Sequence, residues 1–358
     1  MNVHPRIPWP LRLHSLPVFL AESIVHTVDP FAIDFGGGFG IRWYGLSYAA
    51  GFLVAWLILR WLARTDRTPL SAAQASDLLT YLVVGVIVGG RLGDVLFYHQ
   101  SLLWKFSAAF PFWGVLEIHK GGMSSHGGIV GVIVACIVFA RRFRIPWLHV
   151  TDLACFVAPP GLAFGRLANW INGELPGKAL PASMQGNPPW WSVKYPDEIL
   201  SEGFARSAEL AQLPLVKAMA PVAASRGEPL PDAVFRACYA GQAELVGQVA
   251  PLLTARYPNN FIQAATDGLG LGLVMLAVWL VPRKPGVVSG AFLAAYGVLR
   301  VASESIREPD DGVFGIGPLT LPMLLSLGMI IAGAAIIRQG SRGPGPAFGG
   351  LLRRDASP

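Results

Sequence analysis

Repeated apolar stretches of about 20 residues are the feature that most limits what this chain can fold into. A helix rises 1.5 Å per residue, so roughly 20 apolar residues cross a hydrocarbon core of about 30 Å. Trp43 to Leu59 and Pro318 to Ile337 are two such windows. Only 14% of the 358 residues are charged and 53% are hydrophobic, whereas about a quarter of an average soluble domain is charged. The sequence therefore predicts a membrane protein.

We predict an all-α polytopic membrane protein with seven transmembrane helices and an extracytoplasmic head insert. The predicted spans lie near residues 43–61, 77–98, 122–140, 148–170, 262–281, 286–305 and 317–337. The chain then divides into five parts: an N-terminal interfacial segment (1–40), helices one to four (41–170), the insert (171–261), helices five to seven (262–337) and a disordered cytoplasmic tail (338–358). Within the N-terminal segment we predict an interfacial helix at residues 13–28. We expect one or two short helices in the insert. No internal repeat of the kind found in two-fold transporters is evident.

Basic residues are concentrated in alternate loops. One set of loops holds Arg60, Arg64, Arg67, Arg141, Arg142, Arg144, Arg283, Lys284, Arg338, Arg342, Arg353 and Arg354, and the other holds chiefly Lys105 and Lys120. The positive-inside tendency then predicts an external N-terminus and a cytoplasmic C-terminus. This placement accounts for the net charge of +6. No basic run interleaved with aromatic residues supports nucleic-acid binding.

Cysteine and histidine spacing predicts neither a disulfide framework nor a metal site. Cys136, Cys155 and Cys238 are isolated from one another, and the seven histidines are scattered without a metal-ligand spacing. Ser124 and Ser125 lack the G-x-S-x-G context of a serine nucleophile. We expect no cofactor.

Ionisable residues of the predicted spans gather in the outer half of the membrane. They and their polar neighbours are Arg42, Arg91, Asp94, His126, Arg166, Asn169, Glu174, Asp267, Arg300, Glu304 and Arg307. Inserting such a group costs about 2.5 to 3.5 kcal/mol, so these side chains are expected to face a protein interior or a wet cavity. Guanidinium groups bind phosphate oxygens through paired hydrogen bonds. Converging arginines therefore favour a phospholipid headgroup as the ligand.

Two of these groups also have a structural interpretation. Arg300, Glu304 and Arg307 are spaced i, i+4 and i+7 and would share one helical face, which fits either a ligand site or an ion-paired helix contact. Arg91 and Asp94 are spaced i and i+3, which favours mutual neutralisation over ligand binding. Both interpretations stay open from the sequence.

Two further motifs favour function over structure. His126 lies in GGMSSHGGIVG, where glycines allow close approach and the imidazole titrates near neutrality. The signature segment, Gly165 to Gly177, reads GRLANWINGELPG. In it Arg166 supplies charge, Asn172 and its neighbour Asn169 supply neutral hydrogen bonds, and Glu174 could fix an arginine or transfer a proton. A polar helix end tied to a loop would not need so many specific groups.

The signature segment resembles that of the prolipoprotein diacylglyceryl transferases of bacterial inner membranes. The matching residues are Gly165, Arg166, Asn169, Trp170, Asn172, Glu174 and Gly177. Four other blocks resemble the family in the same order: IRWYGLSY with Tyr44, GGRLGDVLFY with Arg91, GGMSSHGG with His126, and YGVLRVASESIREPD with Tyr296, Arg300, Glu304 and Arg307. The resemblance covers roughly residues 40–337 outside most of the insert.

This resemblance implies a seven-span fold with an external head and a lipid-transfer reaction. The diacylglyceryl group of phosphatidylglycerol would move onto the lipobox cysteine thiol of a prolipoprotein, and glycerol 1-phosphate would leave. The expected partners are phosphatidylglycerol, the prolipoprotein signal peptide and membrane lipid. The implied catalytic residues are His126, Arg300, Glu304 and Tyr44, and the implied substrate-binding residues are Arg166, Asn169, Asn172, Glu174, Arg91 and Arg307.

A mechanism can be written on these residues as a hypothesis. A thiol attacks only as a thiolate, and His126 is the candidate base that accepts its proton. Arg166 and Arg300 would stabilise the charge that grows on the departing phosphate. Glu304 would orient Arg300, although Glu304 and Glu174 are the alternative bases.

The sequence departs from the family pattern after the insert. The family usually has arginine-histidine-proline followed by a tyrosine-glutamate pair, whereas Tyr257, Ile262 and Gln263 stand at those places, and Ser125 replaces the common aromatic before the histidine. Two rival functions therefore stay open: a transporter of anionic lipids, and an inactive lipid-binding paralogue.

Overall fold

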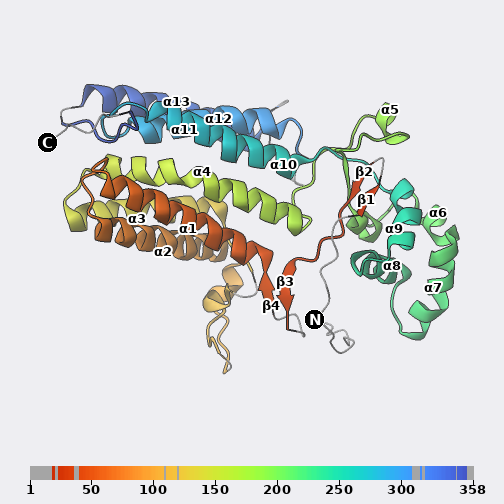
Figure 1. The fold of residues 1–358 in the computed structure, drawn as a ribbon. Helices are drawn as coiled ribbons and strands as arrows, with labels where there is room; N and C mark the ends of the chain where they lie inside the picture. The colour runs from red at the N-terminus through yellow and green to blue at the C-terminus, as the bar shows by residue number, and fades with distance from the viewer. Residues whose placement is uncertain are drawn as a thin grey trace. The chain divides into compact units, whose positions relative to one another are not determined.

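A computed structural model describes residues 18–20, 23–35, 40–108, 110–118, 121–308, 315–316, 319–343 and 345–352 (Figure 1). The chain divides into two compact units. The insert unit comprises residues 1–48, 163–266 and 302–321, and the helical unit comprises residues 49–162, 267–301 and 322–358. Each unit is described below by itself.

Seven helices in the described residues are long and apolar enough to cross a membrane. They are α1 (Trp43–Arg64), α2 (Ala72–Phe97), α3 (Ser125–Phe143), α4 (Trp147–Ile171), the continuous helix Asn259–Val278, α12 (Val287–Glu304) and α13 (Leu321–Arg342). The predicted number of spans is confirmed. The helix Asn259–Val278 consists of α10 (Asn259–Gln263), a π-helical stretch over Ala264–Gly270 and α11 (Leu271–Val278).

The second span begins at Ala72 rather than at residue 77 because a capping box precedes it. The Ser71 hydroxyl accepts a hydrogen bond from the Gln74 amide at 3.1 Å, and the Gln74 side chain accepts one from the Ser71 amide at 2.9 Å. These two bonds satisfy donors that the start of a helix otherwise leaves unpaired. Hydropathy alone does not locate such a start, because side-chain hydrogen bonds at Ser71 and Gln74 define it.

Side chains from several helices pack into the core of the helical unit. Leu59, Leu78, Leu153 and Leu271 are fully buried in it. Phe156 meets Trp279 edge to face, with ring centroids 4.4 Å apart. Because lipid is as apolar as these side chains, close packing rather than exclusion of water holds membrane helices together.

Glycines bring α2 and α3 into backbone contact. The contact runs along Gly85, Gly89 and Gly93 of α2 and Gly127 and Gly131 of α3. A Cβ atom added at Gly131 would lie 1.9 Å from the Gly85 carbonyl oxygen. Spaced small residues of this kind let membrane helices approach closely. They fix where α3 begins, and therefore where the loop before His126 lies.

The insert unit contains more helices than the one or two that we expected. They are α5 (Ala182–Gln185), α6 (Ser207–Gln212), α7 (Pro214–Ser225), α8 (Leu230–Tyr239) and α9 (Ala243–Val249), with 3-10 turns at Pro196–Leu200 and Ala250–Leu252. Val216, Val234, Cys238 and Leu245 are buried between them. The short helices escaped prediction because proline and alanine dominate the segment, and because burial rather than length stabilises them.

Short strands replace the interfacial helix that we expected at residues 13–28. In the described part, β1 (Val18–Leu20) pairs antiparallel with β2 (Ser23–Val25), and β2 pairs parallel with β5 (Val193–Lys194) of the insert. The helix prediction is therefore wrong there, because pairing with residues far along the chain decides the backbone conformation. Residues 1–17 and 21–22 lie outside the described residues. Two hairpins follow elsewhere, β3 (Phe31–Asp34) with β4 (Gly40–Arg42), and β6 (Gly315–Ile316) with β7 (Leu319–Thr320).

The C-terminal segment is ordered further than we expected. α13 continues to Arg342, and Phe348 pairs with Arg283 through two backbone hydrogen bonds of 2.8 Å. The indole of Trp279 donates to the Phe348 carbonyl at 3.1 Å. The prediction of a disordered tail is thus wrong for residues 345–352, whose contacts are with distant residues. Residues 353–358 lie outside the described part.

Candidate functional site

The signature segment forms the end of α4 and a tight turn in the insert unit. α4 ends at Ile171, and the amide of Glu174 donates back to the Asn169 carbonyl at 2.8 Å. Gly173 and Leu175 adopt positive φ angles of 71° and 54°. A left-handed residue commonly closes a helix, and glycine adopts this conformation without strain. The turn therefore aims the polar residues of the segment away from the helix axis.

Two other chain segments bind the signature segment on either side. Gly177 forms a β-bridge with Arg307, and the amide of Lys178 donates to the Ile306 carbonyl at 2.9 Å. On the other side, the backbone amide of Tyr257 donates to the Lys178 carbonyl at 3.0 Å. A Cβ atom at Gly177 would lie only 2.2 Å from the Tyr257 carbonyl oxygen, so glycine is required there. These bridges join three polar segments that are distant in sequence.

The side chains of the signature segment form a polar surface at this junction. Arg166 is partly buried, Asn169 is 8% exposed and Glu174 is exposed. The Asn172 amide donates to a Glu174 carboxylate oxygen at 3.1 Å. Tyr44, near the start of α1, interacts electrostatically with both Glu174 and Arg166. The structure thus brings together residues from two of the predicted sequence blocks.

Glu304 and Arg307 lie on the segment that bridges to Gly177. Their charged atoms are 3.9 Å apart, and both residues are buried. α12 ends at Glu304, and Arg307 instead joins the bridge to Gly177. The prediction of one helical face through residues 300, 304 and 307 is therefore wrong for Arg307. Because the chain leaves the helix after Glu304, the backbone of Arg307 pairs with Gly177 of the signature segment and does not continue the helical face.

Arg91 lies in the helical unit, where its guanidinium binds the loop that precedes α3. It donates to the carbonyls of Val115 at 2.7 Å and Gly114 at 2.8 Å, and to those of Gly121 at 2.9 Å and Gly122 at 3.1 Å. It also pairs with Asp94 at 3.3 Å, as the sequence spacing indicated. Arg91 is 5% exposed. This geometry gives Arg91 a role in shaping the loop before His126.

His126 and Arg300 are the other candidate residues of the helical unit. His126 is exposed in the first turn of α3, and Arg300 is partly buried near the end of α12. Ser124 caps α3 by accepting from the Gly127 amide at 3.2 Å, and its own amide donates to the Gly90 carbonyl at 2.8 Å. The cap fixes the position of His126 on the helix. An exposed imidazole at this position is open to a substrate.

Sequence reasoning missed three residues that contact the signature segment. The Asn259 side chain donates to the Leu175 carbonyl at 3.0 Å, and the Asn260 side chain donates to the Glu174 carbonyl at 2.9 Å. His26 packs edge to face on Trp170 and forms a 2.8 Å hydrogen bond with the Tyr239 hydroxyl. Burial lowers the pKa of His26 to about 4. The two asparagines follow the position at which the sequence departs from the family pattern, which was the available signal.

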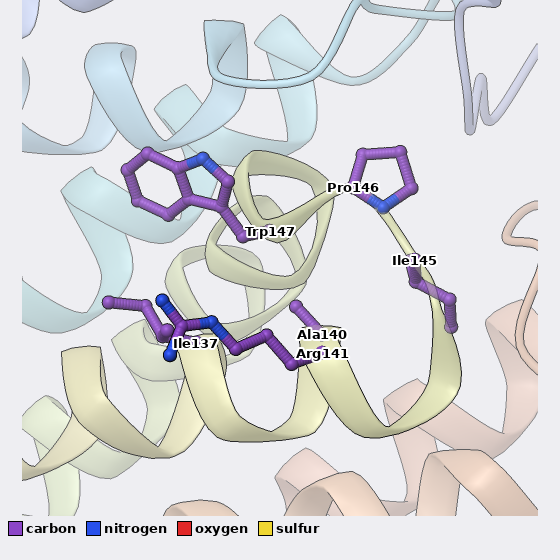
Figure 2. Close-up of a pocket in the computed structure, with 6 residues that line it drawn as sticks. All are labelled: Ile137, Ala140, Arg141, Ile145, Pro146 and Trp147. Carbon is purple, nitrogen blue, oxygen red and sulfur yellow. The ribbon is translucent and has the colours of Figure 1, made fainter.

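A separate cavity of about 500 Å³ lies where α3 ends and α4 begins (Figure 2). Its lining is Ile137, Ala140, Arg141, Ile145, Pro146 and Trp147. His126 lies in the first turn of α3, whereas Arg141 lies in the last. At 1.5 Å per residue these two ends are over 20 Å apart. The cavity is therefore distinct from the neighbourhood of His126.

The polar surface of the insert unit is suited to recognition of a charged headgroup. Arg166 and Arg307 offer guanidinium groups, while Asn169 and Asn172 add neutral hydrogen-bonding groups. Among the described residues, no group of three histidine, cysteine, aspartate or glutamate side chains is arranged to hold a metal ion. The guanidinium, carboxamide and carboxylate groups present can form hydrogen bonds and ion pairs with a ligand.

Comparison with known proteins shows which family this chain resembles. The family model described as prolipoprotein diacylglyceryl transferase matches residues 30–338. A phosphatidylglycerol–prolipoprotein diacylglyceryl transferase of Bdellovibrio bacteriovorus is 38% identical over 88% of this chain and 93% of its own length. A protein of the same description from Rhodopseudomonas palustris is 32% identical over 89% of this chain and 93% of its own length. The similarity thus extends across both units.

Proposed function

The chain belongs to the prolipoprotein diacylglyceryl transferase family, and from this premise we propose that it transfers the diacylglyceryl group of phosphatidylglycerol to a prolipoprotein cysteine. One observation carries the assignment of the site. The signature segment is bridged to Arg307 on one side and to Tyr257 on the other, and Tyr44 interacts with Arg166 and Glu174. This junction gathers the groups that a phosphate-bearing headgroup requires.

The proposed reaction exchanges one bond for another at a single carbon. The cysteine thiolate attacks the glyceryl carbon that carries the phosphate ester, so a carbon–sulfur bond forms and the carbon–oxygen bond breaks. The electron pair of the broken bond stays on oxygen, and glycerol 1-phosphate leaves. The thiol proton passes to His126, which is exposed at the start of α3. An exposed imidazole can accept a proton from the thiol, as a general base does.

Arginine side chains stabilise the charge that develops on the leaving phosphate. Arg166 belongs to the junction described above, and Arg300 is the second arginine assigned to this task. Guanidinium groups bind phosphate oxygens through paired hydrogen bonds and keep their charge at any relevant pH. The charged atoms of Glu304 and Arg307 are 3.9 Å apart. This ion pair holds the chain in place where it leaves the end of α12. Asn169, Asn172 and Glu174 complete the polar lining, and Tyr44 orients Arg166 or the lipid phosphate.

Membrane topology fits this chemistry. We place the N-terminus and the insert outside the cytoplasm and the arginine-rich loops inside, as the positive-inside tendency indicates. The signature segment then lies at the outer surface of a bacterial inner membrane. At that surface phosphatidylglycerol and the signal peptide of an exported precursor are both accessible.

The test is thioether formation by purified protein in detergent with phosphatidylglycerol and a lipobox peptide, followed by mass spectrometry. We expect wild type to form the diacylglyceryl thioether. Removing an electrostatic group that acts on the transition state costs about 10²- to 10³-fold, so Arg166→Ala should lose at least that much. His126→Gln should also lose about 10²- to 10⁴-fold, because general-base catalysis contributes that factor.

Arg226→Ala is the matched control, since Arg226 is exposed at the end of α7 in the insert. Its activity should equal that of wild type. Folded wild type that forms no thioether would overturn the proposal, and retention of lipid in such a sample would favour a lipid-binding or lipid-moving protein. Substantial transfer by His126→Gln would reassign the base to Glu174 or Glu304.

A further inference from the structure

Five polar side chains in or beside the signature segment have buried polar atoms without a hydrogen-bond partner among the described residues. The atoms are Trp170 Nε1, Asn172 Oδ1, Asn259 Oδ1, Asn260 Oδ1, and both Nε2 and Oε1 of Gln263. Leaving a buried polar group unpaired costs about 1 to 3 kcal/mol. Native proteins therefore keep few such groups, and each calls for an explanation. We name Asn259, Asn260 and Gln263 the amide cluster.

Helix geometry places the amide cluster on one face of α10. Gln263 follows Asn259 by four residues and Asn260 by three, and such pairs are neighbours on a helix surface. All three are buried, with exposed fractions of 1%, 1% and 0% for Asn259, Asn260 and Gln263. The Trp170 and Phe261 rings are 4.8 Å apart. The cluster is thus continuous with the signature segment.

A purely structural role accounts for only part of the amide cluster. Asn259 and Asn260 use their Nδ2 donors on the carbonyls of Leu175 and Glu174, which explains why asparagine is present at both positions. Within the part of the chain that the structure describes, their acceptor oxygens have no partner, and neither end of the Gln263 amide has one. An apolar side chain of the same size would fill the position of Gln263 at lower cost. Gln263 therefore indicates a ligand.

The chemistry of the unpaired atoms identifies the class of ligand. Carboxamides and the indole N–H are uncharged, and together they offer both acceptors and donors. A phosphate diester only accepts hydrogen bonds from a protein, and the proposed function assigns that role to Arg166. A hydroxyl group both donates and accepts, so it satisfies a mixed set of this kind.

We infer that the amide cluster binds the free hydroxyl groups of the phosphatidylglycerol headgroup. This inference rests on the proposed function and assigns a part of the site to the glycerol that leaves with the phosphate. It makes Gln263 a specificity-determining residue. Sites built to bond a substrate hydroxyl reject analogues that lack it by large factors, because their own polar groups are then left unpaired.

The test compares two lipids on two proteins. Phosphatidylglycerol and phosphatidylpropanol share the phosphate and three headgroup carbons, but the second lacks the hydroxyl groups. For wild type we expect kcat/KM for thioether formation to be at least about 100-fold higher with phosphatidylglycerol. Gln263→Met keeps the side-chain length without the amide. It should lower this preference at least about tenfold, through loss of activity on phosphatidylglycerol alone.

Two controls separate recognition from folding. Gln212→Met removes an exposed amide on α6 of the same unit and should leave the lipid preference unchanged. The melting temperature of Gln263→Met should equal or exceed that of wild type, because an unpaired buried amide is removed. An equal loss on both lipids, or an unchanged preference, would overturn the inference.

A binding measurement keeps this inference distinct from the proposed function. Native mass spectrometry of each protein in a mixture of the two lipids reports which lipid is retained, whether or not transfer occurs. We expect wild type to retain phosphatidylglycerol preferentially and Gln263→Met to retain both lipids equally. Absence of thioether with this difference intact would count against the transferase reaction only. If wild type and Gln263→Met retained the two lipids in the same ratio, the proposed hydroxyl-binding site would be refuted.

Discussion

His26 and His126 show how differently one residue type can be used in this chain. His26 is fully buried in the insert unit, where it packs on Trp170 and Tyr195 and bonds to the Tyr239 hydroxyl. His126 is exposed in the first turn of α3. Burial penalises the charged imidazolium, so His26 stays neutral at physiological pH. The exposed imidazole of His126 is instead the one to which we assign the thiol proton in the proposed reaction.

Acidification should destabilise the insert unit through His26. The pKa is lowered by burial from 6.5 to about 4 in the folded protein, so between these values the unfolded chain binds a proton that the folded chain does not. Stability is then fully present above pH 6.5 and falls as pH drops toward 4, by up to about 3 kcal/mol. Thermal unfolding measured from pH 7 to 4 checks this. His26→Gln should flatten the profile, and an equal slope in both proteins would contradict it.

Residue-level prediction from the sequence succeeded where a motif is contiguous. The signature segment was found because its polar residues are close together in the chain, and the structure places Arg166, Asn169, Asn172 and Glu174 at one helix end. His26, Asn259 and Asn260 were not found. They meet the signature segment only through the fold, and nothing in their local sequence indicates the partner.

At the scale of elements, the length of the apolar stretches predicts the membrane-spanning helices but not the short strands or the C-terminal segment. A membrane helix must satisfy its own backbone hydrogen bonds, so its length and composition are visible in the sequence. The strands at Val18–Leu20 and Ser23–Val25 are different, because β2 depends on pairing with Val193 and Lys194. The same reason applies to Phe348, which binds the loop after α11.

The contact between α2 and α3 should tolerate a methyl group at one glycine and not at another. A Cβ at Gly131 would meet the Gly85 carbonyl oxygen at 1.9 Å, whereas a Cβ at Gly128 finds its nearest neighbour, the Val86 carbonyl oxygen, at 3.9 Å. We expect Gly131→Ala to lower stability by about 1 to 3 kcal/mol or more, as overpacking does. Gly128→Ala on the same helix is the matched control.

Thermal unfolding of both glycine variants in detergent measures this difference. Replacing glycine by alanine in a helix otherwise stabilises it slightly, so Gly128→Ala should match or exceed wild type. Equal melting temperatures for the two variants would show that α2 and α3 are not in backbone contact. Because this contact also sets the start of α3, Gly131→Ala should reduce transfer along with stability.

At the scale of the whole molecule, the proposed orientation in the membrane predicts which residues are accessible from each side. Ser225, exposed at the end of α7, belongs to the insert, and Ser341 is exposed near the end of α13. A membrane-impermeant maleimide applied to intact spheroplasts should label Ser225→Cys. It should label Ser341→Cys only after permeabilisation. Wild type, with Cys136 and Cys238 buried and Cys155 partly buried, gives the background. The reverse pattern would place the insert in the cytoplasm.

The family assignment applies to the whole molecule, because the matched region, residues 30–338, includes parts of both units. The sequence blocks that resemble the family are spread over α1, α2, α3, α4 and α12. A reaction that moves a diacylglyceryl group from a lipid to a cysteine thiol needs groups for the phosphate, the thiol proton and the glycerol. The chain supplies candidates for each in Arg166, His126 and Gln263.

The most direct test of the central claim is the stoichiometry of the reaction. Phosphatidylglycerol labelled separately in its diacylglyceryl part and its headgroup would be incubated with the purified protein and a lipobox peptide. Transfer predicts one molecule of glycerol 1-phosphate released for each diacylglyceryl thioether formed on the cysteine, with the diacylglyceryl label on the peptide. Headgroup release without thioether, or intact lipid moved between leaflets with neither product, would contradict the account.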